Sequence, residues 1–205
     1  MTHATADDYR WFEADFARLA EAYCITLVRG ITPPEVLRIL RAEVQGHSTG
    51  VVALDEHAYE TAQVHEGTHG YLGVAPLHDW SVLVEPNGYI GTLDGVLSRL
   101  SVGRTAVSHY RNVNAVDHFD WFEDGKPKLH FEPLFAWDRG GSDPDCLVAA
   151  MREVGFATEE GAIDDLDVVT AATFALAERV TGIRLTPELL TTTEFIEGLA
   201  PIPRD

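Results

Sequence analysis

The chain has 205 residues, of which 45% are hydrophobic and 23% are charged, a composition typical of a globular protein with a substantial buried core. Its 33 acidic residues outnumber its 15 basic residues, and the formal net charge is -18. This charge repels the phosphates of nucleic acids and anionic membrane surfaces, so we expect the protein to bind neither. It favours a protein partner with a basic surface, although a high charge of one sign also serves solubility alone.

The start of the chain and its two cysteines bear on the cellular compartment. Met1 precedes THATADDYRW, which has neither the basic nor the apolar region of a secretory signal, and no apolar run approaches the length of a membrane span. Cys24 and Cys146 are far apart in apolar surroundings, which predicts buried free thiols rather than a disulfide. We therefore expect a cytoplasmic protein.

The first part of the chain predicts two helices and then an irregular connection. Residues 4–23 carry an apolar stripe at helical spacing, and CITLVRG follows as a short buried segment. A second helix begins after Thr32, which forms a capping box with Glu35. From about residue 45 to 79 the periodicity fades and histidines and glycines accumulate, so we expect a long irregular connection containing a short helix or strand.

The middle of the chain predicts a mostly antiparallel sheet. A short helix over TLDGVLSRL interrupts it, and the Asp124-Gly125 pair is a strong signal for a two-residue hairpin. Alternation of apolar and polar residues sets the positions of the strands. We expect strands near residues 80–84, 88–91, 104–112, 116–123 and 127–132.

The expected register brings histidines together on this sheet. Two imidazoles supply at most half of a metal site, and the neighbouring phenylalanine indicates a packed face, so we expect cross-strand packing rather than metal binding. Counting from the two hairpin turns gives the expected opposed pairs: Phe119 with His130, His118 with Phe131, and His109 with His118.

The C-terminal third predicts three helices, over SDPDCLVAAMREVG, DLDVVTAATFALAERVTG and TPELL. The fold class is therefore α+β, with N- and C-terminal helices packed on the sheet in a single domain over residues 1–205. The inward positions of the periodic segments predict the core residues, which are Trp80, Val82, Val84, Leu97, Phe131, Leu147, Met151 and Leu176.

VHEGTHGYLG contains a metal-binding pattern, because His65, Glu66 and His69 have the spacing H-E-x-x-H. On a continuous helix this spacing holds zinc between two imidazoles beside a glutamate base. Two glycines within and just after the motif each cost a helix interior up to about 1 kcal/mol relative to alanine. No later histidine supplies a third ligand, and the nearest carboxylate, Glu85, ends a strand. We expect the histidines to lie partly exposed in a loop.

The turn in YRNVNAVDH is a candidate binding site of another kind. Tyr110, Arg111, Asn112 and Asn114 could present hydrogen-bonding groups at the tip of a rigid hairpin, as many binding surfaces do. The alternative is ordinary turn chemistry, since asparagine tolerates left-handed backbone geometry. The sequence contains no nucleophile elbow, phosphate loop, dinucleotide fingerprint or C-x-x-C pair, which weakens enzymatic interpretations.

Five phrases are spread over nearly the whole chain: AYCITLVRGITPPEVLRIL, WSVLVEPNGYIG, VSHYRNVNAVDHFDWFEDG, FEPLFAWDRGGSDPDCLVAAMREVGF and ALAERVTGIRLTPELL. Together they resemble an uncharacterised actinobacterial family that is defined only as a domain of unknown function. The resemblance implies a single domain and assigns no activity and no catalytic or metal residues. The H-E-x-x-H stretch lies outside these phrases, which counts against the zinc interpretation.

Charge, size and the missing catalytic constellation favour a non-catalytic module that binds a protein partner, the class that acidic immunity proteins and antitoxins represent. This hypothesis involves no cofactor. The alternative is a zinc-dependent hydrolase that uses His65, Glu66 and His69.

Overall fold

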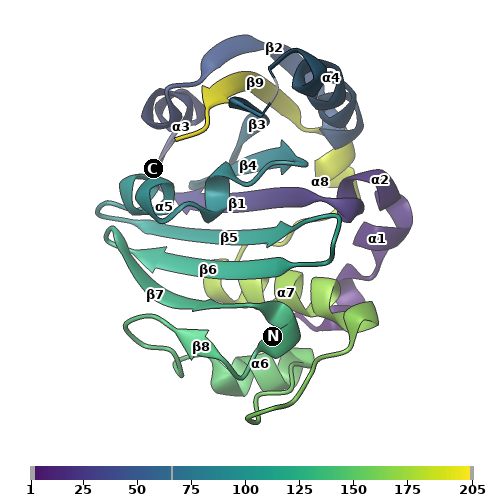
Figure 1. The fold of residues 1–205 in the computed structure, drawn as a ribbon, viewed down its shortest axis with the longest axis vertical. Helices are drawn as coiled ribbons and strands as arrows, with labels where there is room; N and C mark the ends of the chain where they lie inside the picture. The colour runs from purple at the N-terminus through teal and green to yellow at the C-terminus, as the bar shows by residue number, and fades with distance from the viewer. Residues whose placement is uncertain (1–2, 66, 204–205) are drawn as a thin grey trace.

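The computed structural model describes residues 3–65 and 67–203 and has the α+β fold that the sequence predicts (Figure 1). Within these residues nine strands form one antiparallel sheet, in the order β2-β9-β3-β4-β1-β5-β6-β7-β8. The strands are β1 (Tyr23–Arg29), β2 (Glu43–Thr49), β3 (His69–Leu77), β4 (Trp80–Pro86), β5 (Thr105–Arg111), β6 (Asp117–Glu123), β7 (Lys126–Phe131), β8 (Arg139–Gly140) and β9 (Glu194–Pro201).

Helices cover both faces of the sheet. Val82 and Val84 belong to one hydrophobic core and Leu83 between them to a second, so the two cores lie on opposite faces of β4. In Figure 1, α7 lies behind β5, β6 and β7, whereas α5 lies in front of the sheet. The helical elements are η1 (Ala6–Tyr9), α1 (Trp11–Asp15), α2 (Ala17–Glu21), α3 (Pro33–Leu40), α4 (Gly50–His65), η2 (Ile90–Thr92), α5 (Asp94–Leu100), η3 (Pro133–Phe135), α6 (Val148–Val154), α7 (Leu166–Thr181) and α8 (Pro187–Thr192).

Strong local signals produce the expected elements. The Thr32 backbone N–H donates to Glu35 at 3.0 Å, which completes the capping box of α3. Asp124 and Gly125 have φ angles of 47° and 75°, the left-handed geometry of a two-residue hairpin, and they join β6 to β7. These elements depend on contacts within a few residues.

The expectation of a long irregular connection over residues 45–79 is wrong. Most of this segment lies in β2, the 16-residue helix α4 and β3. The buried side chains Val51, Leu54 and Ala58 have helical spacing, but polar and small residues around them obscure the stripe. Packing on the sheet, rather than a continuous amphipathic pattern, stabilises this helix.

Residues 4–23 form η1, α1 and α2 rather than one helix. Phe16 interrupts the helical path with φ and ψ angles of -126° and 42°, and Tyr23 is already the first residue of β1. Tyr23, like the five residues after it, is buried, because β1 runs through the centre of the sheet. A central strand buried on both faces has no alternating pattern to distinguish it.

The strand expected at residues 88–91 is also absent, and η2 occupies part of this segment. The buried carboxylate of Glu85 accepts hydrogen bonds of 2.8 Å from the backbone N–H groups of Ile90 and Gly91. These bonds turn the chain back on β4, so it does not continue as a strand.

The expected strand positions near 80–84, 104–112, 116–123 and 127–132 are confirmed, but the pairings are displaced by one residue. A register shift between Trp121 and Phe122 leaves Lys128 as an extra residue in β7, and the first turn contains five residues instead of two. The displacement changes all three of the expected pairs, whereas Phe122 with Pro127 and Glu123 with Lys126, next to the turn, keep the expected register. The observed pairs are Phe119 with Phe131, Asp120 with His130, His109 with Phe119, and Tyr110 with His118.

At the C-terminal end, α7 and α8 are confirmed, whereas α6 begins only at Val148 and β9 was not expected. The expected core residues are buried except Leu147, which is partly buried just before α6. Cys24 and Cys146 are both free, but only Cys24 is buried, so the expectation for Cys146 is wrong. No helix in the described part of the chain combines the length and apolarity needed to cross a bilayer.

Candidate functional site

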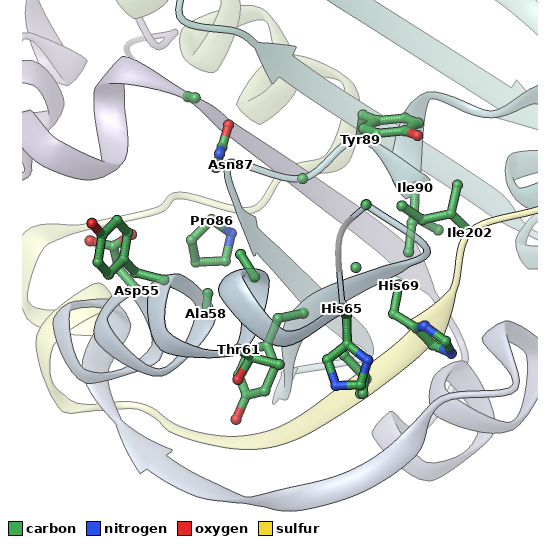
Figure 2. A pocket seen from close by; sticks show the side chains of 18 of the residues that line it. Asp55, Ala58, Thr61, His65, His69, Pro86, Asn87, Tyr89, Ile90 and Ile202 are labelled. Atoms are coloured by element: carbon green, nitrogen blue, oxygen red, sulfur yellow. The ribbon is translucent and has the colours of Figure 1, made fainter.

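A cleft of about 390 Å³ opens between α4 and the turn that follows β4 (Figure 2). Its volume falls within the ~300–1,000 Å³ typical of ligand-binding sites. Glu21 of α2, Tyr71 of β3 and Ile202 after β9 also contribute to the lining. The α4 wall consists of Asp55, Ala58, Tyr59, Thr61, Ala62 and His65, and the facing wall of Pro86, Asn87, Tyr89 and Ile90.

The start of α4 fixes the position of the first wall. Gly50 has a φ angle of 77°, and a Cβ at this position would lie 2.5 Å from the carbonyl oxygen of Thr191. Only glycine combines this geometry with this close approach. Val51 and Leu54 are buried beneath α4, so the helix is held against the sheet while a different side of it lines the cleft.

Hydrogen bonds beneath the facing wall hold it in place. Asn87 has a φ angle of 48°, and its backbone N–H donates to the carbonyl oxygen of Ala22 at 2.9 Å. Burial raises the pKa of Glu85 to about 7, and the backbone N–H groups of Gly91 and Ile90 oppose this rise. Both carboxylate oxygens of Glu85 are occupied by these bonds, so the sequence's nearest candidate third metal ligand is committed to the turn.

The two motif histidines lie side by side at one end of the cleft, with ring centroids 5.1 Å apart (Figure 2). They do not project from one helix, because α4 ends at His65 and β3 begins at His69. The expectation that they are not one turn apart on a helix is confirmed, whereas their expected loop location is wrong. Glu66 lies outside the described residues. The described part of the chain contains no group of three or more His, Cys, Asp or Glu side chains arranged to hold a metal ion.

A buried carboxylate behind α4 was missed by sequence reasoning. Glu197 of β9 lies 2.8 Å from His57 Nδ1 and accepts a hydrogen bond of 3.0 Å from the Tyr71 hydroxyl. The hydrogen bond with Glu197 raises the pKa of His57, and burial raises the pKa of Tyr71. The cluster joins α4, β3 and β9. A strand assignment at β9 would have been needed to find it.

A cationic side chain of the protein itself lies at the α2 edge of the cleft. Arg18 Nε lies 2.7 Å from Asp55 Oδ2, and the guanidinium carbon is 5.3 Å from the centroid of the Tyr59 ring. Burial raises the pKa of Asp55, and the charge of Arg18 opposes this rise. The edge of the cleft thus combines a carboxylate and an aromatic face around a guanidinium group.

The hairpin-tip candidates are not all available for binding. Asn112 Oδ1 accepts hydrogen bonds of 2.9 and 3.1 Å from the backbone N–H groups of Asn114 and Val116, which is turn chemistry. Arg111 is paired with buried Asp117 at 2.9 Å, and Tyr110 stacks on the His118 ring. Arg111 and Asn112 nevertheless line a second hollow of about 450 Å³. Tyr110 and Asn114 do not line it.

The histidine of β5 belongs to the core rather than to a site. His109 is buried, its ring packs edge-on against Tyr23 and Phe174, and burial lowers its pKa to about 3. His118 lies opposite Tyr110 and not opposite His109. The expected packing role of the β5 histidine is therefore confirmed, with different partners.

Comparison with known proteins agrees with the resemblance found in the sequence. A family model described as "Family of unknown function (DUF6461)" matches residues 2–204. No curated protein and no solved structure matches the chain.

Proposed function

We propose that the chain, which belongs to the family of unknown function (DUF6461), is a non-catalytic module that binds a protein partner through the α4 cleft. The observation that carries this proposal is a preformed cleft whose walls are fixed by hydrogen bonds and buried side chains. Pre-formed clefts with apolar and aromatic linings are the usual form of binding sites. Tyr59, Tyr71 and Tyr89 supply aromatic surface, which is enriched in interfaces between proteins.

The charge of the chain supports a basic partner. The net charge is -18, and Glu21 and Asp55 place carboxylates at the cleft itself. Complementary charge accelerates the encounter of two proteins and makes the association rate depend on salt. This is the behaviour of acidic immunity proteins and antitoxins, and we assign the protein to that general class. The same charge disfavours nucleic acid.

The arrangement of the titratable groups supports a role without catalysis. Burial raises the pKa values of three carboxyl groups to about 7. Glu85 and Asp117 are buried and engaged by hydrogen bonds within the protein, and Asp120 lines neither the cleft nor the second hollow. A catalytic acid or base must reach its substrate. A zinc-dependent hydrolase with the H-E-x-x-H motif would need both histidines on one helix, and α4 ends at His65.

The two free cysteines support a reducing compartment, and we propose that the protein acts in the cytoplasm. Cys24 and Cys146 lie in different environments, one buried and the other exposed. An exposed thiol that stays unpaired is compatible with the cytosolic redox potential.

Site-specific photo-crosslinking tests the proposal. A photoreactive phenylalanine analogue replaces Ala62 in the cleft, and the control places it at exposed Ala149 on α6. We expect one discrete adduct in extracts of cells that carry the gene, only with the Ala62 probe. The captured protein, once purified, should bind the unmodified chain at a rate that falls as salt rises. Equal adducts from both probes, or a captured partner with an acidic surface, would reject the proposal.

A further inference from the structure

The α4 cleft and the second hollow form one groove. Glu21 and Val113 line both, so the hollows of about 390 and 450 Å³ adjoin along α2 and the β5–β6 turn. The groove therefore extends from His65 at the end of α4 to Arg111 at the end of β5. Neither hollow alone shows this continuity.

We infer that this groove binds an extended segment of the partner chain that carries arginine or lysine side chains. This inference rests on the proposed function. Each hollow has the volume of a small-ligand site, which suits individual side chains better than an α-helix ~10–12 Å in diameter. An extended segment projects side chains at regular intervals along its length and can place them in two adjoining hollows.

The charges along the groove specify a basic segment. Its two arginines are already paired, Arg18 with Asp55 at 2.7 Å and Arg111 with Asp117 at 2.9 Å. Glu13 and Glu21 are exposed and make no ion pair within residues 3–65 and 67–203. The uncompensated charge of the groove is therefore negative.

Arg18 shows how the groove holds a guanidinium group. The group pairs with Asp55 and lies over the ring of Tyr59, which is 63% exposed and free to accept a further contact. Arginine is suited to such sites because its planar, weakly hydrated cation stacks on aromatic rings and pairs with carboxylates. Tyr89 supplies a second exposed ring from the facing wall (Figure 2). An arginine of the partner competes with Arg18 for this position.

Peptide binding tests the inference. The probe is a fluorescent nonapeptide of alternating arginine and serine, measured by anisotropy beside peptides in which glutamate or alanine replaces arginine. We expect binding of the arginine peptide that weakens with salt, and none of the glutamate peptide. Glu21→Gln should weaken it by ~3–10-fold, as loss of a carboxylate at a charged interface does. Glu160→Gln, which removes the same charge from an exposed position outside the groove, should not.

Arg18→Ala should change the affinity for the arginine peptide in the opposite direction. It releases Asp55 and Tyr59 from their internal contact, so the arginine peptide should bind more tightly than to the unmodified protein. Arginine amide alone fills only one hollow. It should therefore bind at least tenfold more weakly than the nonapeptide, a difference in binding free energy of ~1.4 kcal/mol. Thermal melts establish that each variant is folded.

Three outcomes would overturn the inference. The first is that the arginine peptide shows no binding at ~1 mM. The second is that Glu21→Gln and Glu160→Gln lose the same amount of affinity for it, and the third is that arginine amide binds as tightly as the nonapeptide. If the Ala62 probe still captures one partner, the proposed function stands and only the basic extended segment is rejected. If the peptide binds but no protein is captured, the inferred groove stands and the proposed role in partner binding fails.

Discussion

His57 Nδ1 lies 2.8 Å from Oε1 of buried Glu197, and this contact ties the exposed side of α4 to β9. The two residues are 140 positions apart in the sequence. Because α4 forms one wall of the cleft, the contact joins this wall to β9.

Stability should depend on pH through His57. Glu197 raises the pKa of His57 above its ordinary value of about 6.5, so the folded state holds the proton more tightly than the unfolded state. The stabilising contribution is full below about pH 6.5 and is lost as pH rises through the folded pKa. We expect the difference in melting temperature between wild type and His57→Ala to decrease over this range. A difference that is constant or grows with pH would contradict the prediction.

Glu85 should give a second pH dependence that begins at lower pH. Burial raises its folded pKa to about 7, so ionisation destabilises the folded state increasingly from about pH 4.3 up to pH 7. Glu85→Gln removes this titration. The stability of wild type relative to Glu85→Gln should therefore fall between pH 5 and pH 8 in urea unfolding series. Parallel pH profiles for the two proteins would show that Glu85 does not titrate in this range.

Two neighbouring apolar positions should differ in their tolerance to truncation. Met151 is fully buried in the α6 packing, whereas Leu147 is only partly buried. Met151→Ala should cost roughly 2–5 kcal/mol of unfolding free energy, because truncation of a buried side chain leaves a cavity. Leu147→Ala should cost less. Urea midpoints measure both, and a larger loss for Leu147→Ala would show that the core is misassigned.

The histidine pair should contribute little to stability. His65 and His69 are partly exposed at the cleft, and surface substitutions usually change stability by no more than about 0.5 kcal/mol. We therefore expect the double variant His65→Ala, His69→Ala to keep the melting temperature of wild type.

Metal analysis of protein purified without a polyhistidine tag accompanies this test, with chelator-treated protein as the control. We expect no stoichiometric zinc. One equivalent of zinc in the wild type, lost in the double variant, would favour the hydrolase over the binding module if the double variant also melted several degrees lower.

Elements set by neighbouring residues could be predicted from the sequence. The capping box of Thr32 and Glu35 defines the start of α3, and Asp124-Gly125 defines the hairpin between β6 and β7. The residues of each signal lie within four positions of one another, so the local structure they produce does not depend on contacts with distant segments. The fold class followed from several such elements.

Elements stabilised by distant segments could not be predicted. Gly50 at the start of α4 contacts Thr191, and β9 lies between β2 and β3, which precede it by more than a hundred residues. The sequence of α4 shows no continuous apolar stripe, so its helical signal is weak, and packing on this sheet stabilises the helix.

The candidate site shows the same division. The sequence pointed to two histidines by their spacing and to four residues of the hairpin turn. His65, His69, Arg111 and Asn112 line the groove, whereas Tyr110 and Asn114 do not. The glycines of the motif already argued against one helix through both histidines, but the structure alone showed that His65 ends α4 and His69 begins β3. The structure also showed that α2, the β5–β6 turn and the turn after β4 lie together around one groove. Because these segments are far apart in the chain, only the packing of the sheet and helices places them side by side.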